Sequence, residues 1–154
     1  MYQRLSSFFQ INSIINSRQY GFRPQHSCEH ALLDAKNTIL GALHRKQIAL
    51  LLLIDFSKAF DMVDHTILLG KLSKYGIRGP ALQWISSYLH DRTQYVSVNG
   101  AISSTMPQGS ILGPLLFIIY INDLPRIAPL IHFIMYADDA NIIIFGNSMA
   151  EAQA

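Results

Sequence analysis

Two adjacent carboxylates, Asp138 and Asp139, follow an apolar run at residues 131–135. A second apolar segment, residues 140–145, comes directly after them, and two β-prone segments around a short polar tip predict a hairpin. Like charges at such a tip repel each other, and a divalent cation would relieve the repulsion. The alternative is that both residues are ordinary turn formers.

A third carboxylate, Asp55, ends a continuous apolar run at residues 48–54. The run predicts a strand buried on both faces and therefore central in a sheet covered by helices, although its leucines leave a helix as the competing prediction. If the strand lies beside the hairpin, Asp55 and Asp138 converge at one edge of the sheet. Carboxylates placed in this way can hold two Mg²⁺ ions about 3.5–4 Å apart for in-line phosphoryl or nucleotidyl transfer.

Apolar residues at helical spacing predict the elements that must position these carboxylates. Helices are expected over residues 2–16, from Ser27 to about 44–46, from Asp64 to about 75, from Pro80 to about 89, and from 111 or 114 to 122. Ser27 and Asp64 are the predicted N-caps, so Asp64 is interpreted as a cap and Asp61 as a surface or salt-bridging residue. Residues 94–98 and 101–105 alternate around Asn99-Gly100 and predict a second hairpin.

This order of elements indicates an α+β domain, with helices packed on one face of a mainly antiparallel sheet. The chain has 154 residues, 50% of them hydrophobic, which is enough for one core. Only 14% are charged, against the usual ~25%, which indicates surface that other parts of a larger protein or a ligand would cover. The longest apolar run, residues 111–121, is shorter than the ~20 residues that span a bilayer, so we expect a soluble chain with no membrane partner.

The distribution of charge along the chain indicates the kind of ligand, and the cysteine content indicates the cellular compartment. Residues 1–92 carry a net charge of +5 and residues 93–154 a net charge of −3, which fits a polyanion bound beside a carboxylate metal site. The single cysteine, Cys28, excludes an intramolecular disulfide and is compatible with an intracellular compartment, nucleus or cytoplasm. His26, Cys28 and His30 are spaced like metal ligands, but no second ligand pair follows at zinc-finger spacing, so a zinc module is only a third hypothesis.

Several motifs occur in the order in which reverse transcriptases carry theirs. The stretches that resemble the A, B and C motifs are residues 55–61, 106–110 and 136–139. The stretches that resemble the non-LTR, LINE-type retrotransposon branch are residues 20–24, 112–117 and 120–124. The similarity covers nearly all of residues 18–146.

The resemblance implies a right-hand polymerase palm with part of the fingers, without a thumb. About residues 1–47 would belong to the fingers and about residues 48–146 to the palm. The implied activity is that of an RNA-directed DNA polymerase, with an RNA template, a DNA primer and deoxynucleoside triphosphates as partners and two Mg²⁺ ions, or Mn²⁺, as cofactors. We expect the chain to be a piece of a retrotransposon polyprotein, whose thumb or other chains could be further partners.

The resemblance also implies roles for single residues. Asp55 and Asp138 would ligate both metals, with Asp139 as a supporting carboxylate. Phe60, five residues after Asp55, matches a steric gate that leaves no space for a ribose 2′-hydroxyl, whereas a core position is its alternative.

Gln108 and Gly109 match the loop that faces nucleotide and template, where glycine permits close backbone approach. Arg23 and Lys58 match positions near phosphate, and a plain surface location is the alternative for each. A hypothesis of a different class is a non-catalytic remnant that binds nucleic acid or protein through its exposed former interfaces.

Overall fold

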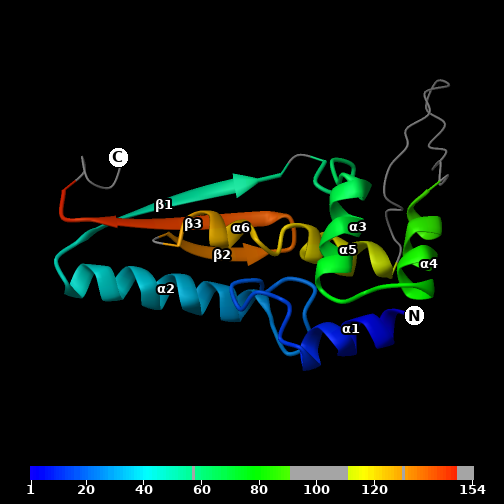
Figure 1. The fold of residues 1–154 in the computed structure, drawn as a ribbon. Helices are drawn as coiled ribbons and strands as arrows, with labels where there is room; N and C mark the ends of the chain where they lie inside the picture. Colours follow the sequence, from blue (N-terminus) through cyan, green and yellow to red (C-terminus); the bar gives the residue numbers. More distant parts are fainter. Residues whose placement is uncertain (57, 91–110, 130, 149–154) are drawn as a thin grey trace, which may run out of the picture. The chain divides into compact units, whose positions relative to one another are not determined.

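The computed structural model describes residues 1–56, 58–90, 111–129 and 131–148 (Figure 1). It divides into two compact units, each built from two stretches that are far apart in the chain. The sheet unit comprises residues 16–56 and 122–154, and the helical unit comprises residues 1–15 and 57–121. The predicted mixture of helices with an antiparallel sheet is confirmed. The division into fingers and palm near residue 47 stays a prediction.

The sheet unit is built on three antiparallel strands in the order β1-β3-β2. The strands are β1 (Ile48–Asp55), β2 (His132–Tyr136) and β3 (Asp139–Gly146). In the β1–β3 pair, Ile48 lies opposite Gly146 and Asp55 lies opposite Asp139. The predicted hairpin is therefore confirmed, and so is its place beside the strand that ends at Asp55.

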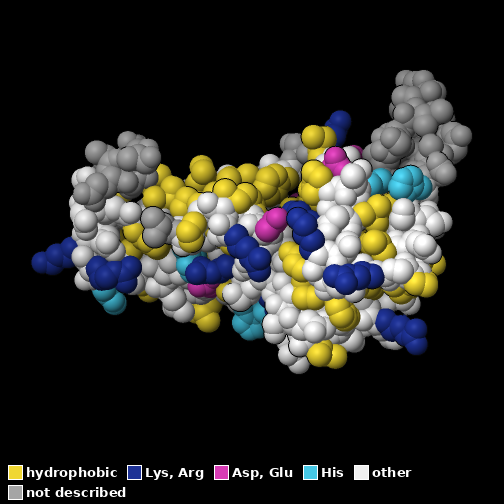
Figure 2. Space-filling model, in the orientation of Figure 1, with side chains coloured by type: hydrophobic (Ala, Val, Ile, Leu, Met, Phe, Trp, Pro, Cys, Tyr) yellow, Lys and Arg dark blue, Asp and Glu magenta, His cyan; other side chains and the backbone are white. Residues whose placement is uncertain are grey.

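The burial of β1 differs from the prediction. Within the part of the sheet that the structure describes, β1 pairs only with β3 and lies at an edge. Leu51, Leu52 and Leu53 are 43%, 49% and 70% exposed, and Figure 2 shows hydrophobic side chains gathered along this strand. The prediction of a central strand buried on both faces is thus wrong, because an apolar run permits burial but the pairing of the strands decides which of them is central.

Helix α2 (Cys28–His44) covers the sheet and contacts all three strands (Figure 1). Its predicted N-cap is confirmed, since the Ser27 side chain accepts a hydrogen bond from the backbone N–H of His30. Ala31 of this helix packs with Ile134 and Ile143 to form the core of the sheet unit. This packing gives the strands a fixed support on one face.

The helical unit holds four helices within the described residues, and three of them begin as predicted. They are α1 (Tyr2–Ile11), α3 (His65–Lys74), α4 (Pro80–Leu89) and α5 (Leu112–Tyr120). Asp64 caps α3 by accepting hydrogen bonds from the N–H groups of Thr66 and Ile67, at 2.8 and 3.0 Å. Helix α1 is shorter than predicted, and Ser13 beyond its end adopts a positive φ of 48°.

The longest apolar run of the sequence forms α5, whose residues from Leu115 to Ile119 are buried in the core. Among the described residues, no helix is long and apolar enough to cross a membrane. In the sheet unit, a short helix α6 (Leu124–Ile127) has Pro125 in its first turn, where we expected proline only to end a helix. The predicted second hairpin, residues 94–105, and the loop at residues 107–109 lie outside the described residues.

Candidate active site

Three aspartates lie at one end of the sheet. Asp55 ends β1 and lies directly opposite Asp139, the first residue of β3. Side chains at directly opposed positions of an antiparallel pair lie on the same face of the sheet. Asp138 occupies the turn between β2 and β3, together with Ala137. The strand that ends at Asp55 therefore lies beside the hairpin with the two adjacent carboxylates, as predicted, and the residue directly opposite Asp55 is Asp139 and not Asp138.

The backbone of the turn is tied to the end of β1. The N–H of Phe56 donates to the carbonyl oxygen of Asp138 at 3.5 Å, and Ala137 adopts a positive φ of 58°. Asp55 and Asp139 are exposed, and Asp138 is half-buried. Within the described residues, no cation forms an ion pair with any of the three carboxylates, so the site holds concentrated negative charge.

The donor set suits a hard divalent cation, because all three side chains offer exposed or half-buried oxygens that no cation in the described part of the chain neutralises. No three His, Cys, Asp or Glu side chains in the described ranges are grouped closely enough to hold a metal ion by themselves. Mg²⁺ usually takes only one or two carboxylates and completes its octahedron with water and substrate phosphates. The residues present therefore fit Mg²⁺ that shares its ligands with a substrate.

Residues 18–20 run alongside β2 and support the turn from the other side. The N–H of Tyr20 donates to the carbonyl oxygen of Met135 at 2.7 Å, and the N–H of Met135 donates to that of Arg18 at 2.8 Å. Gln19 forms a parallel bridge with Met135 and is completely buried. The sequence indicated only a turn or connector here, so this support was missed.

Two residues of this segment touch the turn itself. The side-chain oxygen of Gln19 accepts hydrogen bonds from the N–H of Gly21 at 2.9 Å and from the N–H of Ala137 at 3.3 Å. A Cβ placed on Gly21 would lie 2.1 Å from the backbone nitrogen of Ala137. A glycine inside a connector is the sequence feature that could have indicated such a close approach.

Arg23, predicted to lie near phosphate, is half-buried in the sheet unit. Its Nη1 donates to the carbonyl oxygens of Asn16 and Gln19, each at 3.0 Å, so the guanidinium braces residues 16–23. Burial lowers the pKa of Arg23 below its usual value. The alternative interpretation of Arg23 is a plain surface location. The structure instead shows a half-buried side chain that is hydrogen-bonded to two backbone carbonyls.

Phe60 and Lys58 belong to the helical unit. Phe60 is half-buried, with its ring centroid 4.8 Å from that of Phe117, and Lys58 is exposed with a positive φ of 54°. Asp61 is half-buried, and its Oδ1 is buried without a hydrogen-bond partner among the described residues, so its interpretation as a surface or salt-bridging residue stays a prediction. Gln108 and Gly109 lie outside the described residues. The roles predicted for Phe60, Lys58, Gln108 and Gly109 stay predictions.

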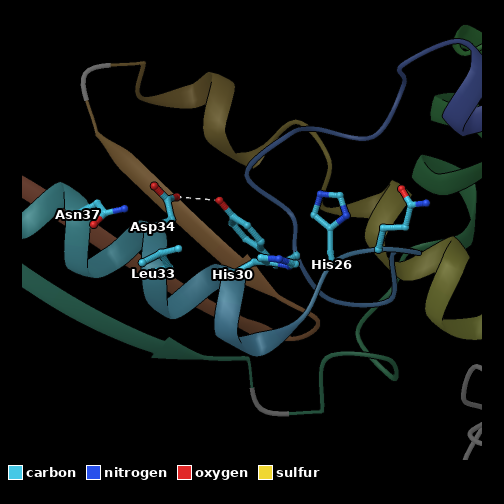
Figure 3. Close-up of a pocket in the computed structure, with 7 residues that line it drawn as sticks. His26, His30, Leu33, Asp34 and Asn37 are labelled. Carbon is cyan, nitrogen blue, oxygen red and sulfur yellow. Dashed lines mark hydrogen bonds between the residues drawn. The ribbon is translucent and has the colours of Figure 1, made fainter.

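A groove of about 460 Å³ lies on the sheet unit (Figure 3). None of the three carboxylates is among the residues that line it. It is lined by Tyr20, Gln25, His26, His30, Leu33, Asp34 and Asn37. Across it, the hydroxyl of Tyr20 donates to Asp34 at 3.0 Å, and burial together with this carboxylate raises the pKa of Tyr20.

The three residues of the zinc hypothesis are all described, and they form no metal-binding group. The rings of His26 and His30 are 6.4 Å apart, and Cys28 is exposed. The Nδ1 of His30 accepts a hydrogen bond from the N–H of Ser27 at 3.2 Å, so the helix cap already uses this side chain.

Comparison with known proteins shows which family the chain matches. Residues 1–154 match the family described as reverse transcriptase (RNA-dependent DNA polymerase). The RNA-directed DNA polymerase from mobile element jockey of Drosophila melanogaster is 32% identical over 163 residues, which cover 97% of this chain and 18% of that protein.

Two further relatives show the range of the similarity. The probable RNA-directed DNA polymerase from transposon X-element of Drosophila melanogaster is 34% identical, over 80% of this chain and 14% of that protein. The group II intron-encoded protein LtrA of Lactococcus lactis subsp. cremoris is 31% identical, over 70% of this chain and 17% of that protein. The chain spans less than a fifth of the length of these curated relatives. It belongs to the reverse transcriptase family, and its similarity to the jockey and X-element proteins places it with the LINE-type, non-LTR retrotransposon members.

Proposed function

We propose that this chain is the catalytic core of an RNA-directed DNA polymerase, which adds deoxynucleotides to the 3′-hydroxyl of a primer on an RNA template. The observation that carries the proposal is the placement of Asp55 directly opposite Asp139, with Asp138 in the adjoining turn, in a chain of this family. Like charges opposed across a strand pair destabilise it. A cation-binding role accounts for a carboxylate cluster that the fold by itself does not favour.

Asp55 and Asp138 would hold two Mg²⁺ ions, or Mn²⁺, and Asp139 would support them from the position opposite Asp55. Bound divalent ions lower the pKa of an attacking hydroxyl and neutralise the charge on a leaving pyrophosphate. The protein's part is to hold the carboxylates on a rigid strand end and turn, so that a primer end and a triphosphate meet at a fixed point. As the new phosphodiester bond formed, the proton of the primer hydroxyl would pass to solvent water and pyrophosphate would leave.

Arg23, Lys58, Gln108 and Gly109 would contact the nucleotide. Arg23, whose Nη1 bonds to two backbone carbonyls, would use its other guanidinium nitrogens for phosphate, and Lys58 would add a second positive charge. Gln108 and Gly109 would face the nucleotide and the template. In this proposal, about residues 48–146 serve as the palm and about residues 1–47 as part of the fingers.

The test is primer extension by the purified chain on a primed RNA template, with deoxynucleoside triphosphates and Mg²⁺ or Mn²⁺. We expect short extension products that disappear when the divalent ion is chelated. Extension that persists without divalent ions, or no extension at any protein concentration, contradicts the proposal. The control is the same reaction without the RNA template.

A second candidate function is a non-catalytic module that binds nucleic acid or protein. The exposed Leu51, Leu52 and Leu53 on β1 favour it, because apolar surface of this kind often marks an interaction site. Template–primer binding that is unchanged by chelation, in a chain that does not extend the primer, would support this candidate over the polymerase.

The steric-gate hypothesis predicts a change in sugar selectivity for Phe60→Val. The smaller side chain would leave room for a 2′-hydroxyl, so the ratio of kcat/KM for ribonucleotides over deoxynucleotides is expected to rise by about 100-fold. Phe117→Leu is the matched control, because it disturbs the same ring contact without shortening the proposed gate. An unchanged ratio in Phe60→Val would leave Phe60 as a packing residue only.

A further inference from the structure

We propose that Gln19 is a positioning residue that holds the turn carrying Asp138, through the backbone N–H of Ala137. The consequence for catalysis rests on the polymerase function proposed above. Gln19 is completely buried and comes from a segment 118 residues before the turn that it touches. Its side-chain hydrogen bonds to described residues reach only the backbone N–H groups of Gly21 and Ala137, so its effect on Asp138 would be exerted through the backbone.

The Gln19 side chain meets a need that the strand ladder cannot meet. β2 ends at Tyr136 and β3 begins at Asp139, so the N–H of Ala137 falls in the turn, outside the paired residues. Ala137 also adopts a positive φ, a conformation that non-glycine residues rarely take and that needs support from its surroundings. The Gln19 side-chain oxygen accepts from this N–H and from that of Gly21. The buried amide oxygen of Gln19 therefore accepts two hydrogen bonds, and each of the two N–H groups has a hydrogen-bond partner.

The backbone of Gln19 is itself held on two sides. Its neighbours Arg18 and Tyr20 bond to the N–H and carbonyl of Met135, at 2.8 and 2.7 Å. Its own carbonyl oxygen accepts from Nη1 of Arg23 at 3.0 Å. The backbone from which the Gln19 side chain extends is therefore held in place, and the side-chain oxygen in turn holds the N–H of Ala137 in place. Because Ala137 directly precedes Asp138, a shift of this N–H moves the Asp138 carboxylate.

The two ends of the Gln19 amide differ, which makes the inference testable. The oxygen has two donors, whereas Nε2 is buried with no hydrogen-bond partner among the described residues. Gln19→Met keeps a side chain of similar size but removes the acceptor. Gln19→Glu keeps an acceptor oxygen at the same distance along the side chain and replaces the unpartnered NH₂ group by a second oxygen, which full burial favours in its protonated, uncharged form. A role carried by the oxygen is therefore lost in the first variant and kept in the second.

Gln19→Met is expected to lower kcat for Mg²⁺-dependent nucleotide addition by about 10–100-fold, because a displaced catalytic group costs rate even when binding is retained. The KM for the deoxynucleotide is expected to change by less than about twofold, and Gln19→Glu is expected to recover most of the lost kcat. Hydrogen exchange of the Gly21 and Ala137 amides is expected to become about 10-fold faster or more in Gln19→Met only. Gln47→Met is the matched control, because Gln47 lies in the same unit and its oxygen accepts a hydrogen bond from Nε of Arg45, at 2.9 Å.

Each outcome decides the inference. Faster exchange in Gln19→Met with an unchanged kcat, or equal losses of kcat in the Met and Glu variants, would overturn it. Unchanged exchange at Ala137 would overturn it as well. If the wild-type chain does not extend a primer, the proposed function fails by itself, and the exchange rates of the Met and Glu variants alone then decide whether the Gln19 oxygen holds the turn.

Discussion

Asp138→Asn is expected to lower Mg²⁺-dependent primer extension by at least about 10³-fold. The substitution keeps the shape of the side chain but removes a charged ligand, and metal stabilisation of a transition state contributes several kcal/mol, of which about 4 kcal/mol corresponds to this factor. Asp55→Asn is expected to have a similar effect. The measurement is the initial rate of nucleotide addition on a primed RNA template over a range of Mg²⁺ concentrations.

The same substitutions are expected to leave the fold intact. Asp55 lies opposite Asp139 across the β1–β3 pair, so Asp55→Asn also removes a repulsion and is expected to raise the free energy of unfolding without metal by about 0.2–1 kcal/mol. The activity would then fall while the stability rises, which is expected where an active site contains an arrangement that destabilises the fold.

Asp64→Asn is the matched control for these carboxylate variants. It removes a carboxylate charge elsewhere, and asparagine still caps a helix N-terminus, so α3 keeps the cap that Asp64 provides. Extension by this variant is expected to stay near the wild-type rate. Extension by Asp138→Asn at the wild-type rate would remove Asp138 from the proposed metal site, and a parallel loss in Asp64→Asn would show that the loss is not specific.

Gly21→Ala is expected to lower the free energy of unfolding by about 3 kcal/mol, at the upper end of the cost of overpacking. The new Cβ would lie 2.1 Å from the backbone nitrogen of Ala137 and 2.9 Å from the carbonyl carbon of Tyr136. Both are backbone atoms and cannot rotate away as a flexible side chain could. The turn with Asp138 must therefore move, so a loss of extension activity is expected to accompany the loss of stability. Urea unfolding followed by circular dichroism measures the change in stability.

Gly70→Ala is the matched control for Gly21→Ala. Gly70 lies in α3, and a Cβ placed on it meets nothing within 4 Å. Alanine inside a helix is favoured over glycine by about 0.5–1 kcal/mol, so this variant is expected to be more stable than the wild type. Equal effects of the two substitutions would show that close packing of Gly21 against Ala137 does not limit stability.

Local features of the chain could be predicted from the sequence because neighbouring residues determine them. Ser27 and Asp64 cap their helices through N–H groups only two or three residues away, and Pro80 begins α4 because its φ suits a first helical turn. The hairpin around Asp138 follows from two β-prone segments with a polar tip. The order and spacing of the motifs were enough to predict the family, and the comparisons confirm it.

The sequence by itself thus determined the order of the described helices and strands except α6, the carboxylates near the ends of the strands, and the family that carries these motifs. Only the tertiary structure decided that β1 lies at the edge of the described sheet, that Asp55 pairs with Asp139, and that Gln19 reaches Ala137. The physical reason is that an apolar run records a tendency to be buried but not the identity of its neighbour. A contact between residues 118 positions apart exists only once the strands have paired and brought those residues together.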